Sequence, residues 1–226
     1  MPHSLLRLLH LCDSLFPIGG FGYSDGLESA ASTGAVATPG GLERWLDVCL
    51  DEIIGRGDGP TLLGAWAAFR ARDWDSLARL DREATALRPS SAARRSSRSM
   101  GLRLMTTWQA LYPDEGVART LALAGEGAIG PSLPTAFACA ASSAAVERRA
   151  AAEAFCYTRL AATVSAAMRL MPLGQTDAHR LLARTLDRVP AAVDLMMTRT
   201  TVESFAPAMD IAAMTQQYLR SRLFRS

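Results

Sequence analysis

Histidine and cysteine are the side chains best suited to hold a transition metal, and in this chain they are not spaced as ligands. His10 and Cys12 are two residues apart, so on a helix their side chains point in different directions. His179 has Asp177 nearby but no second histidine or cysteine at ligand spacing, and there is no C-x-x-C pair. We therefore expect no metal ligands and no cofactor. The cysteines are expected to be buried free thiols: Cys12, Cys49, Cys139 and Cys156.

Catalytic chemistry is further restricted because all 24 basic residues are arginines and the chain has no lysine. A P-loop nucleotide hydrolase needs a lysine that reaches the β- and γ-phosphates, and a pyridoxal enzyme needs one for its Schiff base. No G-x-S-x-G nucleophile elbow is present, and the carboxylates are scattered along helical faces where pairing with arginine is ordinary. The residues indicate no active site, so we predict that the protein is not an enzyme.

A glycine-rich segment at residues 16–28, FPIGGFGYSDGLE, is the most informative short stretch of the chain. Its glycines permit positive φ angles or close backbone approach, and a serine is placed to cap the helix that follows. Two interpretations stay open: a tight helix-to-helix turn with its aromatic side chains in the core, or a loop that presents them to a partner. The predicted partner-binding residues here are Pro17, Gly19, Gly20, Phe21, Tyr23, Ser24, Gly26, Leu27 and Glu28.

The last segment, QQYLRSRLFRS, mixes arginine with apolar and aromatic side chains, which is the usual composition of an interface anchor. Ordering it on binding costs roughly 1–2 kcal/mol per residue, and burial of Leu223 and Phe224 returns ~1.5–3 kcal/mol each. The arginine contacts must therefore contribute, and binding should weaken with salt. Residues 216–226 are expected to form an ordered or a mobile tail, with partner-binding residues Tyr218, Arg222, Leu223, Phe224, Arg225 and Ser226.

The elements that position these segments are helical almost throughout. The clearest helix is expected to begin with Thr38 as its N-cap and Pro39 at its first position, and to end at Gly55 and Gly57. Its apolar residues recur at i, i+3, i+4 and i+7 spacing. No alternating apolar–polar run predicts a strand. We predict one all-α domain over residues 1–226, a bundle of about ten helices with short Gly/Pro connections. The other expected helices span 4–14, 25–33, 60–71, 74–87, 91–111, 114–124, 134–144, 145–171, 175–187 and 190–198.

The overall composition is that of an ordinary globular protein, with 49% hydrophobic and 20% charged residues. A net charge of +2 predicts neither a nucleic-acid nor a membrane partner. The first residues lack the features of a signal peptide, and no apolar stretch approaches the ~20 residues that span a bilayer. We therefore expect a cytoplasmic protein.

Several ordered blocks of the chain resemble the urease accessory protein F (UreF) family. The block LLHLCDSLFPIGGFGYSDGLESAASTGAV is similar to the start of that family, and LERWLDVCL, SRSMGLRL and VSAAMRLMPLGQTDAHRLL follow in the family's order. The end, MDIAAMTQQYLRSRLFRS, is similar to the family's terminal S-R-L-F-R-S. The resemblance covers most of the chain, and its specificity lies in the ordered combination of the blocks.

This resemblance implies an all-α protein without known enzymatic activity that acts in urease maturation. In the family the protein bridges the accessory protein D or H, which contacts apo-urease, and the GTPase G, which delivers nickel; it forms dimers and supports nickel insertion. The resemblance also suggests that the junction PLGQTD lies near a functional surface, through Pro172, Gly174 and Gln175. Local structure explains the junction equally well, because a proline ends the first helix and a glycine permits the turn into the next.

Departures from the family pattern restrict the analogy. A His-Glu pair common before the terminal block is replaced by Gln216 and Gln217, and a common Asn before VSAA is replaced by Ala162. These replacements argue against a nickel contact in this subunit and leave the adaptor role intact.

Three hypotheses of function follow. The first is a non-enzymatic adaptor in urease maturation, with Glu28 as the acidic residue that couples it to the GTPase. The second is a nickel-binding carrier, against which the spacing of His and Cys argues. The third is an α-helical DNA-binding regulator, supported only by the arginine-rich segment 88–103.

Overall fold

The computed structural model describes residues 3–225, and within that range it is built of helices with no strand. This confirms the predicted all-α bundle. The α-helices are α1 (Ser4–Cys12), α2 (Leu27–Ser32), α3 (Pro39–Val48), α4 (Gly59–Ala71), α5 (Trp74–Ala86), α6 (Ser91–Leu111), α7 (Glu115–Gly125), α8 (Leu133–Ser143), α9 (Arg148–Leu170), α10 (Gln175–Leu186), α11 (Val189–Thr198) and α12 (Pro207–Thr215). Shorter or wider helical turns are η1 (Gly20–Gly22), η2 (Cys49–Asp58) and η3 (Gln216–Tyr218).

Helix α3 begins as its sequence predicts. The Thr38 hydroxyl accepts a hydrogen bond from the Gly41 amide at 3.2 Å, and Pro39 occupies the first turn, where a missing N–H costs nothing. Its apolar stripe is buried, with Leu42 and Leu46 fully inaccessible. Burial of one such face supplies most of the stability of a helix in a globular protein.

The expected end of this helix at Gly55 and Gly57 is wrong. The chain instead continues from α3 through a π-helical stretch, η2, directly into α4. A Cβ on Gly55 would lie 2.9 Å from the carbonyl oxygen of Leu50, and one on Gly57 would lie 3.3 Å from the carbonyl oxygen of Glu203. The glycines therefore permit close backbone approach inside a continuous helix and do not terminate it.

Helix α8 forms the centre of the bundle. Every residue from 133 to 142 is buried, and the helix packs against α4 and α6. Small side chains such as Ala136 and Ala140 allow this close approach, and Gly101 on α6 lies so near the chain that an added Cβ would be 2.0 Å from the Pro131 carbonyl oxygen. The core that surrounds α8 connects most of the helices into one apolar cluster.

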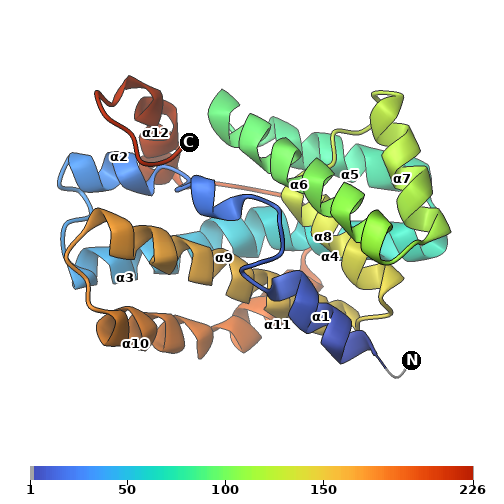
Figure 1. Ribbon diagram of the computed structural model, residues 1–226, viewed down its shortest axis with the longest axis horizontal. Helices are drawn as coiled ribbons and strands as arrows, with labels where there is room; N and C mark the ends of the chain where they lie inside the picture. The colour runs from blue at the N-terminus through green and yellow to red at the C-terminus, as the bar shows by residue number, and fades with distance from the viewer. Residues whose placement is uncertain (1–2, 226) are drawn as a thin grey trace.

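A helix near the start of the chain packs against a helix near its end. Figure 1 shows α2, near the start of the chain, beside α12, near its end, and these helices pack against each other. Sequence periodicity did not predict α12, because it is only nine residues long and its buried residues are few. Along residues 3–225, none of the helices combines the length and apolar character needed to cross a membrane.

Candidate protein-binding site

The glycine-rich loop between α1 and α2 is partly packed and partly presented to solvent. Phe16 is buried against Trp108, with ring centroids 6.1 Å apart, and Tyr23 packs partly against the core. Gly19 has φ +75°, which lets the chain turn into η1. Phe21 then projects with 79% of its surface exposed. The aromatic residues of the loop therefore divide: Phe16 and Tyr23 pack toward the core, whereas Phe21 is exposed.

Gly26 joins this loop to the C-terminal helix. Its φ is +90°, and a Cβ at this position would lie 2.6 Å from the backbone nitrogen of Ala213 on α12. Only glycine satisfies both the left-handed conformation and this close approach. The N-cap of α2 is Gly26 and not Ser24, which corrects the expectation from the sequence; the Ser24 Oγ still accepts a hydrogen bond from the Glu28 amide at 3.4 Å.

Glu28 anchors the C-terminal tail. Its side chain is only 6% exposed, and its carboxylate accepts hydrogen bonds from the Gln216 side-chain amide at 3.1 Å and from the backbone N–H groups of Leu223 and Phe224. A buried carboxylate is stable only when its oxygens find such donors. The Glu28 carboxylate therefore connects residues 216–224 to the start of α2.

Gln216 completes this anchor. Its Oε1 accepts hydrogen bonds from the Ser24 hydroxyl and the Gly26 amide, both at 3.1 Å, while its Nε2 donates to Glu28. The residue is 1% exposed. In the sequence Gln216 is only a departure from a family pattern, whereas in the structure it is the central polar link between loop and tail.

Arg169, near the end of α9, holds the same two segments together. Its guanidinium donates to the Phe21 carbonyl oxygen at 3.0 Å and lies over the Phe224 ring, 4.4 Å from the centroid. A cation–π contact of this kind contributes about 0.5–2 kcal/mol. The Arg225 amide also donates to the Gly22 carbonyl oxygen at 2.8 Å. The tail is thus ordered against the loop through residue 225.

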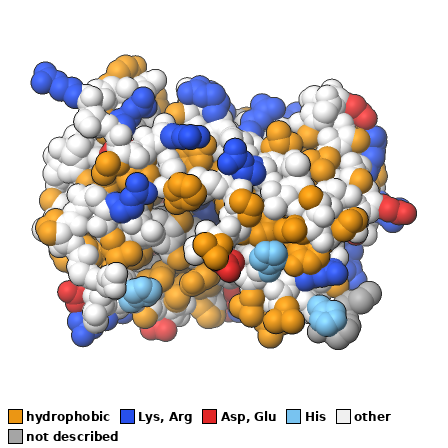
Figure 2. Space-filling model, in the orientation of Figure 1, with side chains coloured by type: hydrophobic (Ala, Val, Ile, Leu, Met, Phe, Trp, Pro, Cys, Tyr) orange, Lys and Arg blue, Asp and Glu red, His pale blue; other side chains and the backbone are white. Residues whose placement is uncertain are grey.

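The loop and tail together form one continuous surface, which we call the loop–tail surface. Phe224 is buried at 3% exposure, whereas Leu223 is 61% exposed. Tyr218 and Arg222 are also exposed. On the face drawn in Figure 2, arginine and hydrophobic side chains predominate and acidic ones are few. Such a surface offers large apolar contacts surrounded by arginine, without an acidic cluster.

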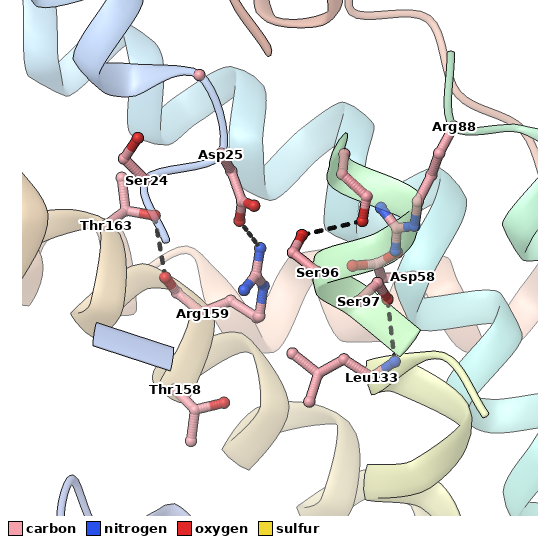
Figure 3. A network of polar contacts seen from close by, with 12 residues as sticks. Ser24, Asp25, Asp58, Arg88, Ser96, Ser97, Leu133, Thr158, Arg159 and Thr163 are labelled. Atoms are coloured by element: carbon pink, nitrogen blue, oxygen red, sulfur yellow. Dashed lines mark hydrogen bonds and ion pairs between the residues drawn. The ribbon is translucent and has the colours of Figure 1, made fainter. Parts of the chain in front are cut away.

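Figure 3 shows two ion pairs near the loop, one partly exposed and one largely buried. Arg159 on α9 pairs with Asp25 of the loop, and Arg88 pairs with Asp58 at the end of η2. Burial opposes ionisation of Asp25, but the charge and hydrogen bond of Arg159 outweigh it and hold the Asp25 pKa below its usual value. The same pairing raises the pKa of Arg159 despite its burial. The loop is therefore connected to α9 by charge as well as by packing.

The thiols near these ion pairs are in their protonated form. Burial raises the pKa of Cys49 and of Cys156 to about 12 each, and the pKa of Cys12 to about 11. All four cysteines are free, as expected, although Cys12 is only half-buried. Within residues 3–225 no group of three or more His, Cys, Asp or Glu side chains is placed to hold a metal ion.

A cavity of about 500 Å³ lies beneath the loop. Its walls come from the loop, α6, α8 and α9, and include apolar residues such as Phe16, Met100 and Phe155 together with Arg159 and Arg169. Pockets of this size and character commonly receive an apolar group from a ligand or a partner. The loop therefore combines an exposed aromatic residue with an adjacent apolar recess.

The sequence-predicted residues fall into two groups. The loop residues, Glu28 and the tail residues 222–225 come together, whereas Pro172, Gly174 and Gln175 are exposed at the α9–α10 junction with no hydrogen bond to the loop or the tail. Ser226 lies outside the described residues. Sequence reasoning missed Arg159 and Arg169, although an arginine inside the apolar run of α9 was a usable signal for a buried pair.

Comparison with known proteins gives a consistent result. The UreF family model matches residues 36–186. The chain is 32% identical to the urease accessory protein UreF of Methylibium petroleiphilum, an alignment that covers 99% of this chain and 94% of the relative. It is 31% identical to the UreF of Teredinibacter turnerae over the full length of both chains, and 32% identical to that of an Azoarcus species over 98% of this chain and 95% of the relative.

Proposed function

The chain belongs to the UreF family of urease accessory proteins, and we propose that it is a non-enzymatic adaptor that bridges the D/H accessory protein and the GTPase G. In this role it supports nickel insertion into apo-urease and modulates the GTPase. The observation that carries the proposal is the loop–tail surface, where two segments at opposite ends of the chain are joined by Glu28 and Gln216.

The D/H protein is the proposed partner of this surface. Exposed Phe21, Tyr218 and Leu223 provide large apolar contacts, and the exposed Arg222 provides charge. Aromatic and arginine side chains supply most of the binding energy in protein interfaces. Because the tail is already ordered against Glu28, binding does not need to repeat the entropic cost of ordering it.

Glu28 acts indirectly in this account. Its carboxylate is buried and occupied by tail donors, so any effect of Glu28 on the GTPase is transmitted through the position of the tail. Glu28 therefore acts by holding the tail in place for a bound partner, and not by touching the GTPase itself.

We further propose that the protein acts as a homodimer in the cytoplasm. Large apolar side chains remain exposed near the C-terminal helices, including Leu195, Phe205 and Ile211, and exposed apolar surface of this kind commonly belongs to an interface. Light scattering at several protein concentrations checks the oligomeric state.

Size-exclusion chromatography with light scattering tests the bridging surface. The chain is mixed with the D/H protein of the same source, with and without residues 218–226. A stable complex that is lost on truncation, and that weakens with salt, is the expected result. A complex unaffected by truncation assigns the contact elsewhere and refutes the role given to the tail.

The alternative of a nickel-binding carrier is tested separately. Equilibrium dialysis of the purified chain against nickel distinguishes the two functions, because an adaptor without its own site retains no more nickel than a matched protein blank. Retention of one tightly bound nickel per chain would favour the carrier.

A further inference from the structure

Three arginines converge on an open depression between α5, α6 and the segment 127–130. The depression has a volume of about 400 Å³ and is lined by Arg82 of α5 and by Arg94 and Arg98 of α6. We call it the arginine basin. None of the residues that form the loop–tail surface lines it.

The local structure holds two of these arginines in place. Arg94 and Arg98 are four residues apart, so they project from the same face of α6. A guanidinium nitrogen of Arg94 donates to the carbonyl oxygens of Arg88 and Pro89, which orients it without neutralising its charge. Arg98 lies against Gly130, where an added Cβ would be 2.1–2.2 Å from three atoms of its guanidinium. The absence of a side chain at residue 130 is therefore what gives Arg98 its position.

The charge of the basin is not balanced by neighbouring carboxylates. Within residues 3–225, no carboxylate lies within 4 Å of the guanidinium nitrogens of Arg82, Arg94 or Arg98, whereas Arg79 on the same helix as Arg82 pairs with Glu83. Asp81 lies at the floor, but both of its oxygens accept backbone amides, from Gly130 at 3.0 Å and Ser132 at 2.8 Å. The basin keeps a positive charge even after the Asp81 carboxylate is counted.

We propose that the arginine basin binds carboxylates of an acidic protein segment. Arginine presents a planar pair of donors that matches a carboxylate, and such charge-assisted hydrogen bonds are stronger than neutral ones. The rim adds small apolar surface from Ala86 and Ala128, which suits a peptide chain. The basin is thus a second docking surface, independent of the loop–tail surface and of the function proposed above.

A nucleic acid fits this surface less well. An extended polyanion needs a continuous basic track, whereas Glu126 precedes the rim segment and the whole chain carries a net charge of only +2. Figure 2 shows blue side chains over the first part of α6 as separate groups with uncharged surface between them. A short acidic segment needs no continuous basic track and no large net charge, and it can place two or three carboxylates in the basin.

Fluorescence anisotropy tests the proposal with the full-length chain. The probe is a short labelled glutamate-rich peptide, and the comparison probes are its glutamine counterpart, a single-stranded oligonucleotide and inorganic phosphate as competitor. The variants are R94Q/R98Q, the charge-matched control R180Q/R184Q on α10, and Gly130→Ala. The last variant displaces the flexible end of Arg98 without changing the net charge or requiring an unusual backbone conformation.

The expected result is salt-sensitive binding of the glutamate-rich peptide alone. R94Q/R98Q should weaken it at least about tenfold, G130A should weaken it measurably, and the α10 control should leave it unchanged. Circular dichroism confirms that each variant is folded. Equal loss in the α10 control, no loss in G130A, preference for the oligonucleotide, or binding of phosphate without the peptide would each overturn the proposal.

Discussion

Replacement of Glu28 by glutamine should release the C-terminal tail while leaving the bundle folded. The carboxylate accepts from three donors, namely the Gln216 side chain and the amides of Leu223 and Phe224. An amide group at residue 28 keeps one acceptor oxygen and puts an N–H₂ group against the remaining donors. The change therefore removes a charge-assisted interaction and leaves buried donors unsatisfied.

The magnitude follows from hydrogen bonds to a charged group, which contribute about 1.5–3 kcal/mol. A loss of this size lowers the docked-to-free ratio of the tail by roughly 10- to 150-fold. Phe224 burial returns only about 1.5–3 kcal/mol, while each ordered residue costs about 1–2 kcal/mol, so the tail has little stability in reserve. The thermal unfolding midpoint should change little, because the donors to the Glu28 carboxylate all belong to residues 216–224 and not to the central helices.

Hydrogen exchange of residues 223–225 measures the effect directly. Exchange should accelerate in E28Q, and trypsin should cleave faster after Arg220 and Arg222. The matched control is E115Q, which removes an exposed carboxylate whose one ion pair within residues 3–225 is with Arg72. Unchanged exchange at residues 223–225 in E28Q would refute the assignment of Glu28 as the anchor of the tail.

Three further changes probe the structure behind the loop–tail surface. Gly26→Ala should destabilise the protein by about 1–3 kcal/mol in chemical denaturation, because φ is +90° and the new Cβ meets α12. Gly20→Ala is the control and should cost little, because a Cβ there makes only ordinary contacts. Equal losses of stability in the two variants would contradict this reasoning. Asp58→Ala should cost about 3–5 kcal/mol, because it removes a buried carboxylate that pairs with the largely buried Arg88, against at most ~1 kcal/mol for Glu115→Ala. Similar midpoints for the two variants would show that burial of the pair does not matter. Since the Asp25 pKa is lowered in the folded protein, its contribution to stability is present above the carboxyl's unfolded pKa and is lost as the pH falls through the folded pKa. The stabilities of wild type and Asp25→Asn, measured against pH, should therefore converge at low pH. Parallel curves would contradict the pairing.

The sequence predicts most helices because their apolar periodicity is strong. Helix α6 spans residues 91–111 as expected, and the Thr38–Pro39 start of α3 is confirmed by its capping hydrogen bond. The glycines of η2 misled the prediction, since a glycine that ends a helix and one that admits a close backbone contact look alike in a sequence. Only the atoms that surround Gly55 separate the two cases.

The sequence predicts which segments form the candidate site but not the contacts that join them. The loop composition and the arginine–aromatic tail indicated both halves of the surface. They are joined by hydrogen bonds from Leu223 and Phe224 to Glu28, almost 200 residues away along the chain. Apolar periodicity describes local structure and cannot predict a contact over that separation. The role of Gln216 is hidden for the same reason, because a buried amide gains its function from the groups around it.

The most direct test of the adaptor role is a three-component mixing experiment. The D/H protein and the GTPase G of the same source are combined with and without this chain, and the components of each chromatographic peak are identified by light scattering and mass. We predict that the GTPase co-elutes with the D/H protein only when the chain is present. Co-elution of the two in its absence, or no ternary complex with folded partners, would contradict the central claim.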